Sequence, residues 1–568
     1  MSGCTGQTLT LLGDEAAALG ALHAGISAAY GYPGTPSTEI LEYLIARYEG
    51  AAGDTDSPAQ SVPIARWCSN EKTALEAALG VSFAGRRALV TMKHVGLNVA
   101  ADPFVNGALL GIKGGLVVAV ADDPGMHSSQ NEQDSRFYAH FAMVPCLEPR
   151  NQQEAYDMIR EAFDLSERFQ APALFRMVTR LSHARAAVQV SAPREQRKPA
   201  KAEDRTRWML LPAYARRNYS ALIEKQRGLE EWSAVHPANK LEPGDRSLVV
   251  ISSGLGGNYY EENLADLISL RGKAPARLHI GTYPLPAELI RRLCRDAEEA
   301  LVIEEGQPFI ETSLRGILPQ PLRISGRLRP GPGGRGIPRT GELDPDNVRE
   351  ALGLPPRPSV LDGPGGLEIS EALAGLPGRP PQLCSGCPHA DSYETIKRAV
   401  AELDGWPEHP DTAITSDIGC YSLGASPPHS VPETIVCMGA SVGMARGAAE
   451  AGIKYALGII GDSTFLHSGI PGLIDAAAAD IPMTVVILDN STVAMTGCQK
   501  TILPSAKLRD LILGLGLKAG HLVELEAKKQ LIGENAARLK EEIAYRGLSV
   551  IIFKRECLEA FRRRGKKS

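Results

Sequence analysis

Short apolar runs alternate with helix-like stretches along most of the chain. In its N-terminal part, strand-like runs at residues 87–91 and 115–121 are interspersed with helix-like stretches at residues 71–83 and 153–168. This alternation is typical of α/β folds, in which helices connect the strands of a parallel sheet. We therefore expect residues 1–192 to form a parallel α/β domain.

Two further α/β stretches, residues 246–325 and 382–568, are expected to form separate units. Residues 193–245 are rich in charged and aromatic side chains, and we interpret them as a connecting segment with some helix of its own. Glycine, proline and arginine dominate residues 326–381. Such a segment cannot bury enough apolar surface to fold by itself, so we interpret it as a linker that runs over the surface.

The composition is that of an ordinary globular protein. Of the 568 residues, 43% are hydrophobic and 22% are charged, and the net charge is −5. Proteins that grip phosphate backbones carry a basic excess, so nucleic acid is not an expected partner. No apolar run reaches the roughly 18–20 residues that cross a bilayer, and the polar N-terminus does not resemble a secretion signal. We expect a cytoplasmic protein with no membrane segment.

The stretches Gly461–Ser463 and Asp489–Asn490 indicate a metal site. Asp462 ends one predicted buried strand and Asn490 ends the next. A right-handed crossover brings such strand ends together at the carboxyl edge of the sheet, where α/β proteins bind ligands. A carboxylate, an amide oxygen and the carbonyl oxygen of Thr492 suit Mg²⁺. The glycine at 461 would let a diphosphate approach the backbone.

The same spacing resembles the thiamine diphosphate motif, which begins with Gly-Asp-Gly and ends with Asn-Asn. Here Ser463 replaces the last glycine and Asp489 replaces the first asparagine. The alternative interpretation of Asp462 is a strand-end aspartate that only caps the following helix.

The cysteines are expected to be thiols or metal ligands, because reducing conditions in the cytoplasm disfavour disulfides. Cys384 and Cys387 form a Cys-x-x-Cys motif, and Cys420 and Cys557 follow it. Four thiolates can hold Zn²⁺ or an iron–sulfur cluster, and spacing alone does not choose between them. We expect Cys498, beside the predicted Mg²⁺ loop, to pack near the cofactor rather than to act as a ligand.

Longer motifs occur throughout the chain. They are Tyr32–Ser37, Asn70–Lys72, Val90–Asn98, Ala121–Gly125, Ser128–Arg136, Thr282–Pro286, Glu304–Glu311, Leu383–Pro388 and Ala494–Gly497. Through these motifs, nearly the whole chain resembles the thiamine diphosphate-dependent 2-oxoacid:ferredoxin oxidoreductases, and among them the large (alpha) subunits of the indolepyruvate type.

The resemblance implies a multidomain thiamine diphosphate-binding fold of the α/β class. Residues 1–192 would be the pyrimidine-binding domain, and residues 246–325 a transketolase C-terminal-like domain. Residues 382–568 would form the diphosphate- and Mg²⁺-binding domain with the cysteine site. In this superfamily the cofactor lies between the first and the last of these domains.

The resemblance also implies roles for single residues. Glu71 would hydrogen-bond the aminopyrimidine ring and activate the cofactor, and the alternative is a first-turn glutamate favoured by the helix dipole. Thr35 would contact the 2-oxo acid, and the alternative is a turn residue. His94, His127 and His467 are candidates for acid–base or substrate contacts, and equally for structural histidines.

The implied cofactors are thiamine diphosphate, Mg²⁺ and a [4Fe-4S] cluster. The residues implied to bind the diphosphate and Mg²⁺ are Gly461, Asp462, Ser463, Asn490 and Thr492. The thiols implied to hold the cluster are Cys384, Cys387, Cys420 and Cys557, of which Cys557 has the least distinctive surroundings.

The implied reaction is the oxidative decarboxylation of an aryl 2-oxo acid with coenzyme A to an aryl-acetyl-CoA and CO₂. Electrons would pass through the cluster to ferredoxin or a ferredoxin-like subunit, and a smaller beta subunit would complete the enzyme. Large subunits of this type usually continue into a ferredoxin-like domain with two Cys-x-x-Cys-x-x-Cys-x-x-x-Cys-Pro runs. This sequence contains no such run, so we expect a separate carrier. The basic stretch Arg562–Lys567 would dock an acidic carrier, or would simply be solvated.

Two other hypotheses stand beside this one. The first is a non-oxidative thiamine diphosphate-dependent 2-oxo acid decarboxylase or ligase, with zinc or no metal at the cysteines. The second is a redox or scaffold subunit that has lost catalysis. The presence of Glu71, Asp462 and Asn490 argues against the second.

Overall fold

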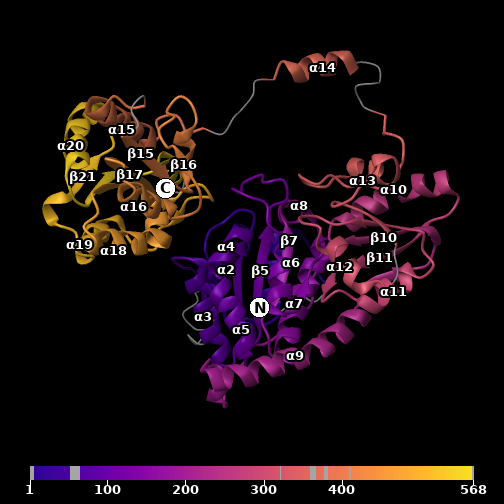
Figure 1. Cartoon of the computed structure of the whole chain (residues 1–568). Helices are drawn as coiled ribbons and strands as arrows, with labels where there is room; N and C mark the ends of the chain where they lie inside the picture. Colours follow the sequence, from indigo (N-terminus) through magenta and orange to yellow (C-terminus); the bar gives the residue numbers. More distant parts are fainter. Residues whose placement is uncertain are drawn as a thin grey trace. The chain divides into compact units, whose positions relative to one another are not determined.

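The computed structural model describes residues 6–51, 64–319, 322–358, 366–376, 382–407 and 411–565. The chain forms two compact units, Met1–Ser370 and Glu371–Ser568 (Figure 1). Each unit has its own sheets and hydrophobic cores. The helix α14 (Gly366–Ala374) spans the boundary between them.

The first unit is built around a seven-stranded sheet. In spatial order, its strands are β12 (Thr282–Tyr283), β6 (Cys146–Leu147), β7 (Ala173–Val178), β5 (Leu116–Asp122), β4 (Ala88–Lys93), β2 (Ala28–Gly31) and β3 (Ile64–Trp67). β12 is antiparallel to β6, and the other neighbouring pairs are parallel. Along β5, Val117 and Ala119 face one core, whereas Leu116 and Val118 face another. Burial on both faces explains the continuous apolar run of this strand.

Helices cover both faces of the seven-stranded sheet. They are α1 (Gly13–His23), α2 (Thr38–Ala51), α3 (Glu71–Phe83), α4 (His94–Val99), α5 (Ala101–Leu110), α6 (Arg136–Ala142), α7 (Gln152–Phe169) and α8 (Thr179–His183). α1, α2 and α7 pack in one core, and α3 and α5 pack in the other. An antiparallel ribbon of β1 (Thr8–Leu12) and β8 (Arg185–Gln189) contacts α1.

The first unit also contains a five-stranded sheet. In spatial order, its strands are β14 (Arg323–Ser325), β13 (Glu299–Ile303), β10 (Asp245–Ser253), β11 (Pro275–Ile280) and β9 (Lys240–Glu242). β9 is antiparallel to β11, and the other neighbouring pairs are parallel. The associated helices are α10 (Gly256–Arg271), α11 (Ala287–Cys294), α12 (Phe309–Ile317) and α13 (Pro345–Ala351).

Two segments outside the regular β/α alternation pack onto the first unit. The long helix α9 (Pro212–Val235) contacts α5 at one end and α11 at the other, and runs along the lower edge of the view in Figure 1. α13 packs on α10. Val348 and Leu352 are buried there in the same core as α1 and α7, so this stretch of the proline- and glycine-rich segment belongs to the folded unit.

A buried ionic network joins the two sheets of the first unit. Its members, all buried, are Asp122, Asp134, Arg136, Glu148, Arg176, Tyr283 and Glu304. Arg136 donates to Asp134 at 2.5 Å and lies 3.1 Å from Glu304. Arg176 donates to Asp122 at 2.6 Å. Buried charges are tolerated only when they are paired in this way.

Four of the long sequence motifs supply members of this network. They are Ala121–Gly125, Ser128–Arg136, Thr282–Pro286 and Glu304–Glu311. Burial raises the pKa of Glu304 to about 7, although the positive charge of Arg136 opposes the shift. The structure therefore gives these motifs a part in joining the sheets.

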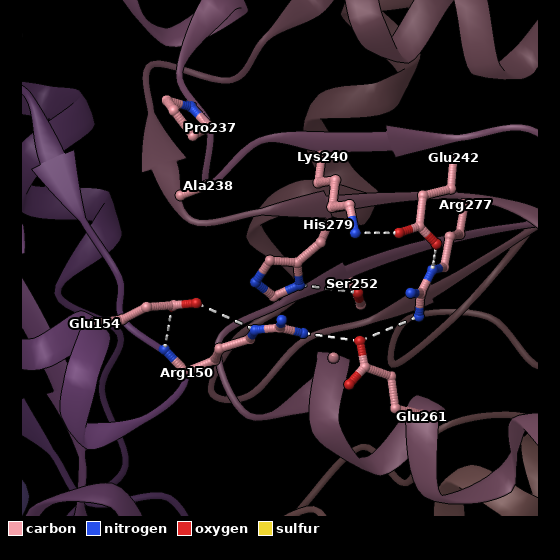
Figure 2. Close-up of a pocket in the computed structure, with 11 residues that line it drawn as sticks. Arg150, Glu154, Pro237, Ala238, Lys240, Glu242, Ser252, Glu261, Arg277 and His279 are labelled. Atoms are coloured by element: carbon pink, nitrogen blue, oxygen red, sulfur yellow. Dashed lines mark hydrogen bonds and ion pairs between the residues drawn. The ribbon is translucent and has the colours of Figure 1, made fainter. Parts of the chain in front are cut away.

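A small cleft between the start of α7 and the five-stranded sheet is closed by ion pairs (Figure 2). Arg150 pairs with Glu154 at 3.2 Å and with Glu261 at 2.9 Å. Arg277 lies 3.3 Å from the same Glu261, and it also donates to Glu242, which pairs with Lys240 at 2.6 Å. The three cations of the cleft all have carboxylate partners, and these ion pairs link the start of α7 to α10 and the five-stranded sheet.

The second unit contains a six-stranded parallel sheet. In spatial order, its strands are β16 (Thr434–Ile435), β15 (Thr412–Ser416), β17 (Tyr455–Gly461), β18 (Met483–Asp489), β22 (Ser549–Lys554) and β21 (Leu522–Glu526). The helices are α15 (Pro388–Asp404), α16 (Ala440–Glu450), α17 (Asp462–Thr464), α18 (Ile470–Ala478), α19 (Leu508–Gly514), α20 (Ile532–Ala544) and α21 (Leu558–Gly565). α15 and α20 pack in one core, and α16 and α18 pack in another.

Smaller features complete the second unit. A wide π-helical turn, Phe465–Gly469, joins α17 to α18, and β19 (Thr492–Val493) forms a hairpin with β20 (Gln499–Lys500). Within the ranges that the structure covers, no helix is both long and apolar enough to span a membrane.

Candidate functional site

The carboxyl ends of β17 and β18 bring two aspartates together in the second unit. The strands are parallel neighbours, with Gly461 paired to Leu488. Asp462 begins α17 directly after β17, and Asp489 is the last residue of β18. Both side chains are buried. The ends of β17 and β18 therefore lie side by side at this edge of the sheet, as the sequence pattern predicted.

The two carboxylates are suited to binding a cation. The Oδ2 atom of each is buried and accepts no hydrogen bond from the described part of the chain. Burial, and then the negative charge of Asp489, raise the pKa of Asp462 well above its usual value. Adjacent buried carboxylates are stable as anions only beside a positive charge. Hard oxygen donors prefer Mg²⁺, so these residues fit that ion.

Asp489 was not among the predicted metal ligands. Its Oδ1 atom accepts from the N–H of Ser491 at 3.0 Å and from the hydroxyl of Ser505 at 2.7 Å. The only signal in the sequence was its place directly before Asn490, where the cofactor motif has an asparagine.

Asn490 is tightly held at the same edge. Its Oδ1 accepts from the N–H of Thr492 at 3.1 Å, and its Nδ2 lies 3.1 Å from Nε2 of His389. Its backbone carbonyl accepts from the N–H of Cys557 at 3.1 Å. The amide of Asn490 is thus fixed between the backbone of Thr492 and the ring of His389.

Gly461 and Ser463 flank Asp462. A Cβ atom at Gly461 would lie 2.5 Å from the ring of Tyr421, so the glycine is needed for this packing. The N–H of Ser463 donates to Oδ1 of Asp462 at 2.8 Å. The Ser463 hydroxyl is buried and has no hydrogen-bond partner among the described residues, which leaves it available to a ligand.

The predicted cluster thiols lie in one region of the second unit. The N–H of Cys387 donates to the carbonyl of Cys384 at 2.9 Å, which closes the Cys-x-x-Cys turn. Burial, and then the negative charges of Cys387, Cys557, Cys384 and Cys498, raise the pKa of Cys420 to about 12. The thiol of Cys498 also contacts that of Cys557. Cys498 therefore belongs to the same group.

The thiols share a neighbourhood without forming a closed coordination sphere. Across the ranges described, no group of three or more His, Cys, Asp or Glu side chains is arranged to hold a metal ion. Cys384 is exposed, and Cys387, Cys420 and Cys557 are half-buried. The donors are nonetheless of the soft type that suits zinc or iron–sulfur clusters.

In the first unit, predicted site residues follow the carboxyl ends of adjacent parallel strands. Thr35 follows β2, Glu71 follows β3, and Lys93 ends β4 directly before His94 starts α4. Ser128 lies in the loop after β5, and its hydroxyl donates to the carbonyl of Thr35 at 3.3 Å. We call these residues the strand-end cluster. Such an edge is where open α/β sheets bind ligands.

Glu71 is buried at the start of α3. Asn70 caps this helix by accepting from the N–H of Thr73 at 2.9 Å. Glu71 is 5% exposed, and a Cβ atom at Gly96 would lie 2.5 Å from its Oε1 atom. Glycine at 96 therefore lets the backbone of α4 approach the carboxylate.

Lys93 is the residue of the strand-end cluster that sequence reasoning missed. Its Nζ donates to the carbonyl of Ser128 at 3.2 Å. Burial lowers its pKa to about 8, against the negative charges of Asp123 and Glu71. The available signal was a lysine at the end of a fully apolar strand.

The three candidate histidines have different surroundings. His94 is buried, and its Nε2 donates to the carbonyl of Asn131 at 2.9 Å. His127 is exposed and lies 3.2 Å from Glu342. His467 is buried and contacts the hydroxyl of Ser468.

Comparisons with known proteins support this picture. Residues 19–230 match the family described as pyruvate flavodoxin/ferredoxin oxidoreductase, thiamine diphosphate-binding. Residues 417–511 match the C-terminal TPP-binding domain of thiamine pyrophosphate enzymes. This second segment contains the whole edge formed by β17 and β18.

Relatives match over most of the chain. Indolepyruvate oxidoreductase subunit IorA of Archaeoglobus fulgidus is 36% identical over 99% of this chain and 89% of its own length. The protein of the same name from Methanothermobacter marburgensis is 38% identical over 87% of this chain and 77% of its own length. Among solved structures, a 2-oxoglutarate:ferredoxin oxidoreductase from Magnetococcus marinus covers 56% of this chain and 61% of its own, with a TM-score of 0.45 and 15% identity.

The parallel α/β sheets and the family matches define a thiamine diphosphate-binding protein of the 2-oxoacid:ferredoxin oxidoreductase class, and they confirm the predicted fold class. Within this class, the chain belongs to the family of indolepyruvate oxidoreductase subunit IorA. The resemblance seen in the sequence motifs is therefore confirmed.

Proposed function

We propose that the chain is the catalytic subunit of an arylpyruvate (indolepyruvate-type) ferredoxin oxidoreductase. In the proposed reaction, an aryl 2-oxo acid, coenzyme A and two oxidised ferredoxins give an aryl-acetyl-CoA, CO₂, a proton and two reduced ferredoxins. The names of the relatives support the substrate, and the word subunit in those names supports a smaller partner chain.

The observation that carries the proposal is the buried pair Asp462 and Asp489. Both lie inside the segment that matches a TPP-binding domain, and each has a buried oxygen without a donor among the described residues. Together with Asn490 and the carbonyl of Thr492, they would hold Mg²⁺ and, through it, the diphosphate. Thiamine diphosphate, when bound, supplies the carbon nucleophile on which decarboxylation of a 2-oxo acid depends.

The strand-end cluster would serve the organic part of the reaction. The Glu71 carboxylate would accept a hydrogen bond from the aminopyrimidine ring, which is strong when water is excluded. Lys93 would bind the carboxylate of the 2-oxo acid through its ammonium group, and Thr35 would orient the same substrate. His94 would offer its Nδ1, which is buried and has no partner among the described residues.

The thiols of Cys384, Cys387, Cys420 and Cys557 would hold a [4Fe-4S] cluster that accepts electrons one at a time. Their support is the shared neighbourhood that raises the pKa of Cys420 and the soft character of thiolate donors. A ferredoxin or ferredoxin-like subunit would then take the electrons.

Anaerobic purification of the chain with its smaller partner subunit tests the proposal. The expected protein is brown, and its broad visible absorbance bleaches when indolepyruvate and coenzyme A are added together. The acyl-CoA product and reduced ferredoxin should form in a ratio of one to two. These readouts separate substrate turnover from cofactor content.

The alternative hypothesis, a non-oxidative decarboxylase or ligase, predicts a different result. A colourless, zinc-containing or metal-free protein that releases the aryl aldehyde and CO₂ without coenzyme A would replace the proposal. A brown protein that turns over aliphatic but not aryl 2-oxo acids would keep the class and overturn the substrate.

A further inference from the structure

The side chain of Asn490 has only one orientation that satisfies its neighbours. The N–H of Thr492 can only donate, so the amide atom 3.1 Å away must be the oxygen Oδ1. The nitrogen Nδ2 then faces Nε2 of His389 at 3.1 Å. Because Nδ2 can only donate, Nε2 must be the unprotonated ring nitrogen.

This arrangement leaves one position free on Oδ1. An amide oxygen has two lone pairs, and Thr492 occupies one of them. If the amide were reversed, a nitrogen would take the place of the oxygen, and a hard cation would lose its ligand. His389 is 3% exposed, so water does not compete freely for the contact.

The groups that hold residues 489 and 490 come from segments that carry thiols. His389 lies in the first turn of α15, two residues after Cys387. The N–H of Cys557 donates to the carbonyl of Asn490 at 3.1 Å, and the N–H of Arg555 donates to the carbonyl of Asp489 at 3.1 Å.

The two thiol-bearing segments are also joined to each other. Nη1 of Arg555 donates to Asp391 of α15 at 2.7 Å. The start of α15, the segment around Cys557 and the end of β18 therefore form one hydrogen-bonded unit. The ring of Tyr421, next to Cys420, packs edge-on against His389 with centroids 6.2 Å apart.

We propose that His389 is a positioning residue for the cofactor metal, holding the amide of Asn490 so that its oxygen faces the cation. The inference rests on the proposed function, because that function puts Mg²⁺ at Asp462 and Asn490. Partners that orient metal ligands in this way are commonly worth about 10–100-fold in metal affinity.

The test compares two substitutions in the full-length chain. His389→Leu fills the space without an acceptor, whereas His389→Gln places Oε1 where Nε2 lies. The measurement is the thiamine diphosphate-dependent part of Mn²⁺ binding, followed by the EPR signal of free Mn²⁺ under anaerobic conditions. We expect His389→Leu to weaken binding about 10–100-fold and His389→Gln to stay within about 3-fold of the unsubstituted protein.

A merely structural histidine would give another pattern. Equal Mn²⁺ affinity in His389→Leu and the unsubstituted chain would overturn the inference, as would a loss in His389→Gln as large as that in His389→Leu. Thermal unfolding of each variant shows whether it is folded, and His389→Met replaces His389→Leu if the leucine does not fold.

Two further variants separate this inference from the proposed function. His429→Ala is the matched control, because His429 contacts the ring of Tyr393 in the same unit and should leave Mn²⁺ affinity unchanged. Asp462→Ala should abolish the thiamine diphosphate-dependent binding. If the unsubstituted chain shows no such binding, the proposed function fails. If it binds and only Asp462→Ala loses binding, the role of His389 alone fails.

Discussion

Glu71 and Lys93 carry opposite charges in the strand-end cluster of the first unit. Glu71 is enclosed by the backbone of α4 at Gly96, and Lys93 contacts the backbone of Ser128. Neither side chain forms part of a hydrophobic core, and each has a charge that a ligand can use. Their contributions can be separated because, in the proposed function, Glu71 would act on the cofactor and Lys93 on the substrate.

Glu71→Gln keeps the shape of the side chain and removes its charge. We expect kcat of the reconstituted enzyme to fall about 10²–10⁴-fold, because the neutral amide cannot assist proton transfer at the cofactor. The thermal unfolding midpoint should change little. The control is Glu76→Gln on the same helix, where the side chain is half-exposed and pairs with Lys72. Full activity in Glu71→Gln would remove this residue from the mechanism.

The pKa of Lys93 predicts how kcat/KM for the 2-oxo acid depends on pH. This pKa is lowered to about 8 by burial, and an ammonium group is charged only below its pKa. The kcat/KM for the 2-oxo acid should therefore be level below pH 8 and fall above it.

Lys93→Met should remove that decline and lower kcat/KM at pH 7 about 10–100-fold, the effect of one hydrogen bond to a charged group. Lys72→Met, on exposed α3 surface, is the control and should behave as the unsubstituted enzyme. A decline above pH 8 that persists in Lys93→Met would assign the titration to another group.

At this scale, sequence reasoning found residues that stand inside motifs and missed those defined by contacts. Asp462 and Asn490 directly follow buried parallel strands, and this pattern predicted that both would lie at one edge of the sheet. The contact of His389 with Asn490 joins residues 101 positions apart. This contact depends on how two distant segments pack together, and the periodicity of the sequence does not predict such packing.

At the scale of elements, α21 packs against segments that carry the thiols. Leu558 lies 3.2 Å from the position of a Cβ atom at Gly386, in the Cys-x-x-Cys turn. Arg563 donates to the carbonyl of Gly497, beside Cys498, at 2.7 Å. Phe561 and Arg562 are exposed on the same helix. The described part of the basic stretch is thus a helix packed over the proposed electron exit.

Reversing one charge on α21 should weaken docking of an acidic electron carrier. We expect Arg562→Glu to raise KM for ferredoxin about 2–5-fold at low ionic strength, because exposed charges mainly steer association. The difference should shrink with added salt, and kcat at saturating carrier should not change. Arg546→Glu, an exposed residue beyond α20, is the control. Equal KM values for Arg562→Glu and the unsubstituted enzyme would exclude α21 as the docking surface.

Sequence patterns located the buried elements well. The apolar runs at 455–460 and 483–488 correspond to β17 and β18, and the helix-like stretch at 153–168 corresponds to α7 (Gln152–Phe169). Fully buried strands and amphipathic helices leave a clear pattern because burial decides which of their positions are apolar. Packing of α13 against α10 was not predicted, since its few buried side chains lie in a segment rich in glycine and proline.

At the scale of the whole molecule, the two units differ in how they are held together. The first joins two sheets through fully buried arginines, whereas the second has one sheet with a core on each face. Units with separate cores can unfold separately. A change in the ionic network should therefore be felt in one unit only.

Arg136→Met should destabilise the first unit by about 3–5 kcal/mol, because it leaves Glu304 buried without its paired cation and Asp134 with only the more distant Arg176. In differential scanning calorimetry we expect one unfolding transition to move to lower temperature and the other to stay. Arg227→Met removes an exposed pair with Glu231 on α9 and should change stability by less than about 0.5 kcal/mol. A shift of both transitions would show that the units unfold together.

The same network constrains how the family can diverge. Replacing Arg136 or Arg176 would leave buried carboxylates without a cation. A lineage that makes this change must therefore also replace the facing acids, or it loses the fold. Residues 122, 134, 136, 148, 176, 283 and 304, though scattered along the chain, should therefore be inherited as a block and covary between distant relatives. Conservation of these residues would then reflect the need to join the two sheets, whichever oxo acid the enzyme uses.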